Sequence, residues 1–121
     1  MDNGKKLWVF PDLEMPEKGK FENIGHESII ILNMNSVPAN IKMTLYFADR
    51  EPVRDIPLVV EADRVRCLRT YNPDDFGGFE IPGLTQYAIR IESDVEIVAQ
   101  YGRLDTSDQP MAFYTVMGYS S

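Results

Sequence analysis

Residues 25–33, with the sequence GHESIIILN, hold the one histidine of the chain, His26, directly before a carboxylate, Glu27. A histidine beside a carboxylate is a combination that general acid–base catalysis can use. Neighbouring side chains on a β-strand point to opposite faces, however, so the two could act on one atom only where a bulge turns one of them. The simplest interpretation is structural: His26 caps a loop or bonds to a buried carbonyl, and Glu27 is solvated.

The other patterns that support catalysis or metal binding are missing from the sequence. One histidine and one cysteine, Cys67, give no ligand spacing typical of zinc, and no GxSxG motif is present. Gly77 and Gly78 lie in the acidic segment DDFGGFE, which would repel a phosphate. Cys67 is interpreted as a small apolar residue of a strand. The sequence therefore predicts no catalytic residue, no metal and no cofactor.

A second polar cluster ends the apolar segment VAQYGRLD, residues 98–105. Arg103 and Asp105 are two residues apart, so on an extended chain they share a face and could pair. The planar guanidinium of Arg103 also suits a bound carboxylate or vicinal hydroxyl groups. A salt bridge that closes the strand and a contact with a ligand are both open interpretations.

The single tryptophan, Trp8, is the third candidate. Most of the aromatic residues of the chain are expected in the core or at a subunit interface. Sugar-binding sandwiches, however, also present exposed Trp and Tyr rings beside polar side chains, which makes Trp8 a candidate platform for a ligand.

Length and composition restrict the class of protein. The chain has 121 residues, 44% hydrophobic and 26% charged, which predicts one globular domain over residues 1–121. The formal net charge of -7 argues against nucleic acid or anionic lipid as a partner. No signal peptide and no apolar run of about 20 residues is seen, so a cytoplasmic location is expected.

These candidates lie on a chain of short β-prone segments. We expect strands over 6–10, 28–34, 40–48, 56–62, 64–70, 86–93, 95–102 and 111–119. The first should stop at Pro11, and a turn at Ser93 and Asp94 should fold two segments into a hairpin. The isoleucine run of 28–34 is typical of a strand covered on both faces. Seven to eight short strands predict an all-β, antiparallel β-sandwich.

Several blocks in the same order make the chain similar to the sensory rhodopsin transducer family. They are HESIIILN (26–33), YFADREPV (46–53), RVRCLRTYN (64–72), SDVEIVAQYGRLD (93–105) and VMGY (116–119). The resemblance implies an all-β sandwich, a homotetramer, and a role in binding instead of catalysis. It also implies docking on the cytoplasmic face of a seven-helix photoreceptor, a link to DNA that the acidic charge disfavours, or small-molecule binding with sugar-related ligands as one class.

The resemblance marks a set of positions for a shared polar site. The residues on family motif positions are His26, Glu27, Arg103 and Asp105, with Asn33 and Gln100 as further matches that are open to a structural role. Our leading hypothesis is a non-enzymatic, cytoplasmic, small-molecule-binding domain in which the first four line a cleft and Trp8 forms its apolar wall. The alternative is a signalling adaptor that docks on a membrane receptor such as a sensory rhodopsin.

Two further hypotheses stand beside these. A glycoside-processing enzyme would need two carboxylates that face each other across a cleft. In a purely structural role, an Arg103–Asp105 pair repeated in every subunit would fix the geometry of an oligomer.

Overall fold

The computed structural model describes residues 4–15, 26–105, 112–116 and 119–121, with only the backbone at His26, 104–105 and 112–116. The described residues form eight strands and one short 3₁₀ helix. They are β1 (Lys5–Glu14), β2 (His26–Asn33), β3 (Ala39–Phe47), β4 (Val53–Val60), β5 (Arg64–Arg69), η1 (Pro73–Phe76), β6 (Gln86–Asp105), β7 (Ala112–Val116) and β8 (Tyr119–Ser120). The prediction of an all-β, antiparallel fold is confirmed.

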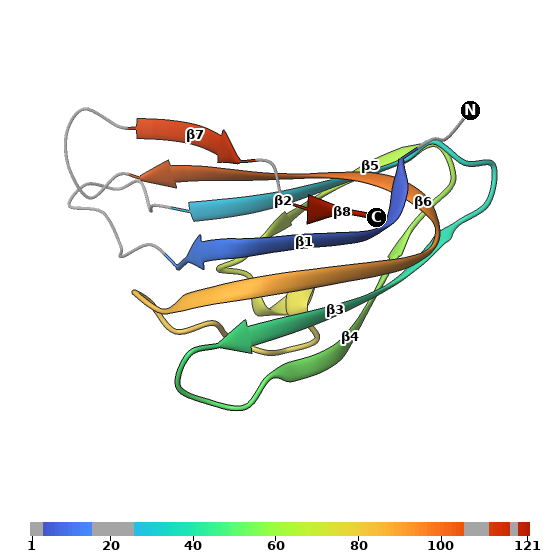
Figure 1. The fold of residues 1–121 in the computed structure, drawn as a ribbon. Helices are drawn as coiled ribbons and strands as arrows, with labels where there is room; N and C mark the ends of the chain where they lie inside the picture. Colours follow the sequence, from blue (N-terminus) through green and yellow to red (C-terminus); the bar gives the residue numbers. More distant parts are fainter. Residues whose placement is uncertain (1–3, 16–25, 106–111, 117–118) are drawn as a thin grey trace.

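One long strand, β6, belongs to both layers of the sandwich. Its first half pairs with β3 and β1, which gives the order β4-β3-β6-β1-β8. Its second half pairs with β2 and β7, and β5 adds to the outer edge of β2. We call the first layer sheet A and the second sheet B. Figure 1 shows β6 curving from beside β3 to beside β7.

The expected hairpin over residues 86–102 is wrong, because Ser93 and Asp94 bend β6 without reversing it. Lys5 is opposite Ile97 while Leu7 is opposite Glu92, so a step of two residues along β1 corresponds to a step of five residues along β6. The two turn-forming residues are used locally: the Ser93 hydroxyl accepts from the amide of Val95, and the Asp94 carboxylate accepts two bonds from Asn40 on β3. The polar pair therefore stabilises a bulge where β6 leaves one sheet for the other.

The expected end of the first strand at Pro11 is also wrong. β1 continues to Glu14, and its register with β6 shifts between Phe10 and Leu13. A proline lacks the amide that a regular ladder needs, and a register shift removes that requirement. Leu13 and Glu14 therefore still pair with Tyr87 and Gln86 at the start of β6.

Alternation along the strands fills the space between the sheets. Ile29 and Ile31 of β2 are fully buried, whereas Ile30 and Leu32 are partly exposed, so β2 is covered on one face and the expectation of two covered faces is wrong. The largest fully buried side chains are Phe10, Leu13, Ile29, Ile31, Met43, Leu45, Leu68, Phe76, Ile89, Ile91, Ile97 and Tyr101. The core is thus an apolar layer between the inward faces of both sheets.

The segment 71–83, between β5 and β6, contains the short helix η1. The side chain of Asn72 caps it by accepting from the amide of Asp74, and its last residue, Phe76, is fully buried. No helix among the described residues is long and apolar enough to cross a membrane.

Candidate functional site

Glu27 is fully buried at the start of β2, which corrects the expectation that it is solvated. It shares a strand face with Ile29, so its side chain points between the two sheets. Its backbone lies opposite Arg103 of β6. A carboxylate on the core face of a strand needs partners from its neighbours, because an unpaired buried charge is strongly disfavoured.

Four donors from three segments of chain converge on the Glu27 carboxylate. Its Oε1 accepts from the hydroxyl of Tyr87 at 2.6 Å and from that of Thr70 at 3.3 Å. Its Oε2 accepts from the hydroxyl of Tyr101 and from the backbone amide of Glu14 at 3.0 Å. The bonds tie β2 to the end of β1, to both halves of β6 and to the residue after β5. We call these five residues the Glu27 network.

Burial and hydrogen bonding act in opposite directions on this carboxyl. Burial raises the pKa of Glu27 above its ordinary value of 4.5, while the bonds from Tyr101, Tyr87 and the Glu14 amide and the charge of Arg103 work to lower it. The pKa of Tyr87 is raised well above 10, by burial first and by the Glu27 carboxylate second. Tyr87 therefore stays a neutral phenol that donates to Glu27. Each described group bonded to the carboxyl oxygens is a donor, which suits the ionised form.

Arg103 contacts the end of β1. Its Nη1 donates to the carbonyl of Glu14 at 2.9 Å, and its Nη2 lies 3.7 Å from a carboxylate oxygen of the same residue. The side chain is only 12% exposed. The described ionic partner of Arg103 is thus Glu14. The expected pair with Asp105 lies outside the described residues, because the side chain of Asp105 is not among them.

The backbone brings the four predicted polar residues to one end of sheet B. His26 is opposite Leu104, Glu27 is opposite Arg103, and Asp105 is opposite Ala112 of β7. For His26 and Asp105 the described part of the chain gives this position and no side-chain contact. Ligand binding by the four residues stays a prediction.

Trp8 lies elsewhere in the molecule. The residue is 8% exposed, its Nε1 donates to the carbonyls of Lys5 and Ile97 at 3.1 Å each, and its ring stacks against Phe10. It precedes Glu14 by six residues of β1, which separates the two by roughly 20 Å. Trp8 therefore packs in the core, as most aromatic residues of such a chain do, and offers no exposed platform. A ligand contact by Trp8 stays a prediction.

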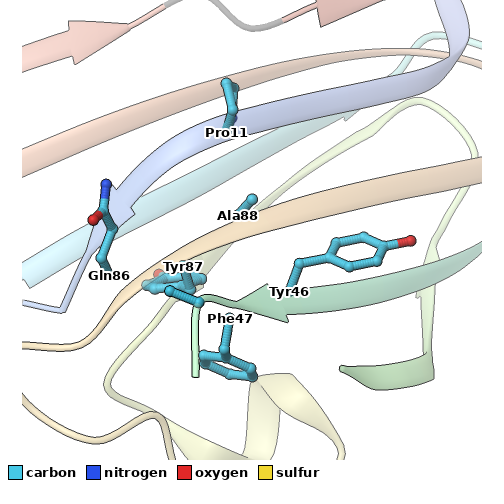
Figure 2. Close-up of a pocket in the computed structure, with 7 residues that line it drawn as sticks. Pro11, Tyr46, Phe47, Gln86, Tyr87 and Ala88 are labelled. Carbon is cyan, nitrogen blue, oxygen red and sulfur yellow. The ribbon is translucent and has the colours of Figure 1, made fainter. Parts of the chain in front are cut away.

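A hollow of about 320 Å³ opens near the start of β6. It is lined by Pro11, Tyr46, Phe47, Ala48, Gln86, Tyr87 and Ala88 (Figure 2). Tyr87 connects this hollow to the Glu27 network, since its hydroxyl donates to Glu27. We call the hollow the Ala88 groove. In the part of the chain that the structure describes, no three His, Cys, Asp or Glu side chains are grouped to hold a metal ion.

The sequence-based search missed Tyr87, Tyr101, Thr70 and Glu14. A signal for the two tyrosines was present: both lie on the inward face of apolar β6 segments, where a hydroxyl needs a buried acceptor. Thr70 follows a strand, and Glu14 contributes its backbone amide, a contact that no residue type predicts.

Comparisons with known proteins bear on the whole chain. A model of the family described as Anabaena sensory rhodopsin transducer matches residues 3–120. A solved structure described as Thermotoga maritima 1070 superposes with a TM-score of 0.84 at 32% identity, covering 98% of this chain and 97% of that one. The solved Anabaena sensory rhodopsin transducer superposes with a TM-score of 0.70 at 31% identity, covering 84% of this chain and 90% of that one. No curated protein gives a significant match.

Proposed function

The chain belongs to the Anabaena sensory rhodopsin transducer family, and from that premise we propose that it is a transducer, a signalling adaptor that docks on a membrane receptor of the sensory rhodopsin type. The membership confirms the resemblance found in the sequence blocks. The single observation that carries the proposal is the family match over residues 3–120, supported by the superposition on the Anabaena transducer. Docking on a receptor at the cytoplasmic face of the membrane would require a cytoplasmic location, which is part of the proposal.

The interior supports an action by contact, without catalysis. Glu27, the fully buried carboxylate of the described chain, directs its oxygens at Tyr87, Tyr101, Thr70 and the Glu14 amide. Such a carboxylate holds the two sheets together and has no open approach for a substrate. A glycosidase-type pair would need a second carboxylate across a cleft from it, and Glu14 presents its backbone amide to Glu27.

The direct test is binding to a purified sensory rhodopsin in lipid nanodiscs, followed by surface plasmon resonance. Nanodiscs without receptor control for attraction to lipid, and the Anabaena transducer serves as the reference analyte. The proposal predicts saturable binding that needs the receptor. Equal responses on receptor-containing and empty nanodiscs, at concentrations where the reference saturates, would contradict it.

Self-association is a second part of the proposal. The outer face of sheet B carries Leu32 of β2 between Val65 of β5 and Val98 of β6, which lie opposite it in the two ladders. Ile30 precedes Leu32 by two residues and so lies on the same face of β2. Val65 is 63% exposed and the other three are partly exposed. Contiguous apolar side chains on a surface favour a protein partner. We propose that a second copy covers this face in a homo-oligomer, with the tetramer of the resemblance as the expected form.

Small-molecule binding is a second candidate function, and the Ala88 groove is the observation that favours it. Its volume lies at the lower end of the range for ligand pockets. Sugars are one class to test. A thermal-shift panel of sugars and small carboxylates on the purified chain tests this function, and a panel without any shift would contradict it.

A further inference from the structure

Strand β4 is an edge of sheet A, and β5 is an edge of sheet B. The short turn 61–63 joins the two strands, and the guanidinium of Arg66 donates to the carbonyl of Val59 at 2.8 Å. The two edges therefore lie close together on one side of the sandwich. An edge strand presents backbone groups that can pair with another chain, and proteins usually block such edges.

The edge of β4 is blocked by its own sequence. The carbonyl of Val59 points outward, because it accepts from Arg66. Pro57, two residues earlier, therefore also faces outward, and it has no amide to offer on that side. The strand bulges at Asp55, whose φ is +57°, and the register with β3 shifts there. A further strand cannot form a regular ladder with β4.

The edge of β5 has no proline and no bulge. The amide of Arg69 donates to a carboxylate oxygen of Asp75 at 3.1 Å, and its carbonyl accepts from the amide of Asn72 at 2.9 Å. Both bonds point away from β2, and because directions alternate along an antiparallel strand, the backbone groups of Cys67 and Val65 also point outward. No group that the structure describes bonds to the amides and carbonyls of these two residues. The edge therefore offers two donors and two acceptors to another strand.

The edge strand is basic, in a chain whose formal net charge is -7. Three of its six residues are arginines, Arg64, Arg66 and Arg69, and none is acidic. Among the described residues the ion pair that involves β5 is the 3.9 Å contact of Arg66 with Asp75, while Arg64 bonds to the carbonyl of Asp63. A second β5 edge would place arginine beside arginine. The charge therefore favours an acidic partner over another copy of this edge.

Asp75 shows how a carboxylate fits beside β5. Its Oδ2 accepts from the outward amide of Arg69, while its Oδ1 lies 3.9 Å from Nη2 of Arg66. It lies at one end of β5, in the place of a neighbouring strand, and provides an acceptor where such a strand would provide a carbonyl. One carboxylate of the chain itself thus combines the two interactions that an acidic strand would make along the rest of the edge.

The geometry of an added strand determines the pattern of its side chains. A residue opposite Arg66 points to the same face as Arg66, and a residue two positions away lies opposite Arg64. Arg64 is exposed and the side chain of Arg66 is 41% exposed, so acidic side chains at these two positions can reach both. The alternate positions lie beside Val65 and Cys67, where apolar side chains extend the apolar outer face of sheet B.

We propose that the edge of β5 binds an extended peptide, in which acidic and apolar residues alternate, as an added antiparallel strand of sheet B. Backbone bonds to Val65 and Cys67 supply affinity, and Arg64 and Arg66 select the charge. The inference goes beyond receptor docking and self-association and depends on neither. The edge consists of backbone groups, whereas the surface that we assign to a second copy is the outer face of side chains.

The test is an NMR titration of the ¹⁵N-labelled chain with an acetylated and amidated hexapeptide in which glutamate alternates with valine. We expect saturable shifts centred on residues 64–69 and slower hydrogen exchange of the Val65 and Cys67 amides, because both become bonded. The same peptide with lysine in place of glutamate should give no saturable response. A peptide that is N-methylated at its valines keeps its charge but loses the amides that face β5, and should bind roughly tenfold or more weakly.

Two substitutions with matched controls locate the site. Cys67→Pro removes an outward amide without loss of a bond to β2, and should weaken the glutamate peptide roughly tenfold or more. Cys67→Ser keeps that amide and should bind as the wild type does. Arg64→Gln should weaken binding about two- to fivefold, whereas Arg54→Gln, at an exposed arginine of β4, should have no effect. Thermal unfolding checks each fold, and the two arginine variants decide the question should Cys67→Pro not fold.

Each contrary result overturns a stated part of the inference. No saturable response to the glutamate peptide would overturn all of it, and equal binding to Cys67→Pro and Cys67→Ser would place the peptide elsewhere. Equal binding of the glutamate and lysine peptides would overturn the acidic class. A short oligothymidine that shifts residues 64–69 where the peptide does not would make the arginines a phosphate-binding surface. Val65 and Cys67 amides that are protected in the free chain and lose protection on dilution would assign the edge to a second copy.

Discussion

At the scale of single residues, Glu27 combines an unfavourable burial with a full set of donors. Removal of a carboxylate from water costs several kcal/mol, and charge-assisted hydrogen bonds offset such a cost when all lone pairs find partners. Tyr87, Tyr101, Thr70 and the Glu14 amide provide those partners. The pKa of Glu27 is raised overall, because the effect of burial on that pKa is larger than the opposing effect of the hydrogen bonds.

The raised pKa gives a prediction for the pH dependence of stability. The folded state holds the Glu27 proton more tightly than the unfolded chain, so its stabilising contribution is complete below about pH 4.5 and declines as pH rises through the folded pKa. Glu27→Gln removes this titration. We expect the free energy of unfolding of the wild type, relative to Glu27→Gln, to fall with rising pH above 4.5, as measured by urea unfolding at a series of pH values.

The charged and titratable groups that face Glu27 define the control for that experiment. Among the described residues they are Tyr87, Tyr101, Arg103 and, beside Arg103, the carboxylate of Glu14. Glu14→Gln keeps the backbone amide that bonds to Glu27 and removes only the carboxylate beside Arg103. A wild-type difference from Glu27→Gln that is flat with pH, or that rises, would contradict the account.

Arg103 carries the second prediction. Arg103→Ala removes the bond to the Glu14 carbonyl and the charge that lowers the pKa of Glu27. We expect a loss of about 1–3 kcal/mol in the free energy of unfolding and a further rise in the Glu27 pKa. Arg103→Lys is the matched control, since it keeps the charge and should return the pKa toward that of the wild type. The carboxyl carbon shift of Glu27 in NMR reports the titration directly, and an unchanged pKa in Arg103→Ala would exclude this role.

The sequence predicted Glu27 and Arg103 as members of one polar site, but it did not predict that Glu27 is buried. Glu27 and Arg103 were selected because they fall on family motif positions, and the structure brings them opposite each other. The burial of Glu27 was missed because strand alternation gives two faces without saying which one is the core face. The run of isoleucines does not show which face is buried, because Ile29 and Ile30 are the same residue type although only Ile29 is fully buried.

At the scale of elements, the bend of β6 is the feature that builds the sandwich. Because β6 passes from sheet A to sheet B, the start of β1 must lie very close to β6 where β6 bends. Gly4 marks that place: its φ is +110°, and a Cβ there would lie 2.0 Å from the carbonyl oxygen of Ile97. Glycine is required by both the backbone conformation and the close approach.

Gly4→Ala therefore gives the third prediction. The added methyl group must push β1 away from Ile97, whose carbonyl also accepts from Trp8. We expect a loss of about 2–3 kcal/mol in the free energy of unfolding, measured by chemical denaturation. Gly83→Ala is the control, because nothing lies within 4 Å of a Cβ at that position, and it should change stability little. Equal effects of the two substitutions would show that the β1–β6 contact is not as described.

Most of the strands could be predicted from the sequence, and the failures have physical causes. Period-2 patterns placed β3 and the start of β6 well, because one face of each is buried. Ser93 and Asp94 have the chemistry of a turn, yet here their side chains bond to Val95 and Asn40 and support a bulge. Pro11 looked like a stop, although a register shift accommodates it. Local preferences cannot distinguish a turn from a bulge when the deciding partner lies on another strand.

At the scale of the whole molecule, the apolar outer face of sheet B gives the fourth prediction. Val65→Glu places a charge at the most exposed member of that face, opposite Leu32 in the ladder. We expect the wild type to be a homo-oligomer by light scattering and the variant to shift toward the monomer, because an interface disfavours an unpaired buried charge. Val59→Glu, at an exposed valine of β4 in sheet A, is the matched control. A monomeric wild type would exclude self-association, and an oligomer unaffected by Val65→Glu would place it on another face.

The central claim is that the chain transduces the state of a receptor, and a transducer must bind two receptor states with different affinity. The most direct measurement is the dissociation constant of the chain for a sensory rhodopsin in nanodiscs, in the dark and under continuous illumination. The account predicts saturable binding whose dissociation constant changes with light by about fivefold or more, the usual lower bound of allosteric coupling. Equal affinity in dark and light, or no binding that depends on the receptor, would contradict it.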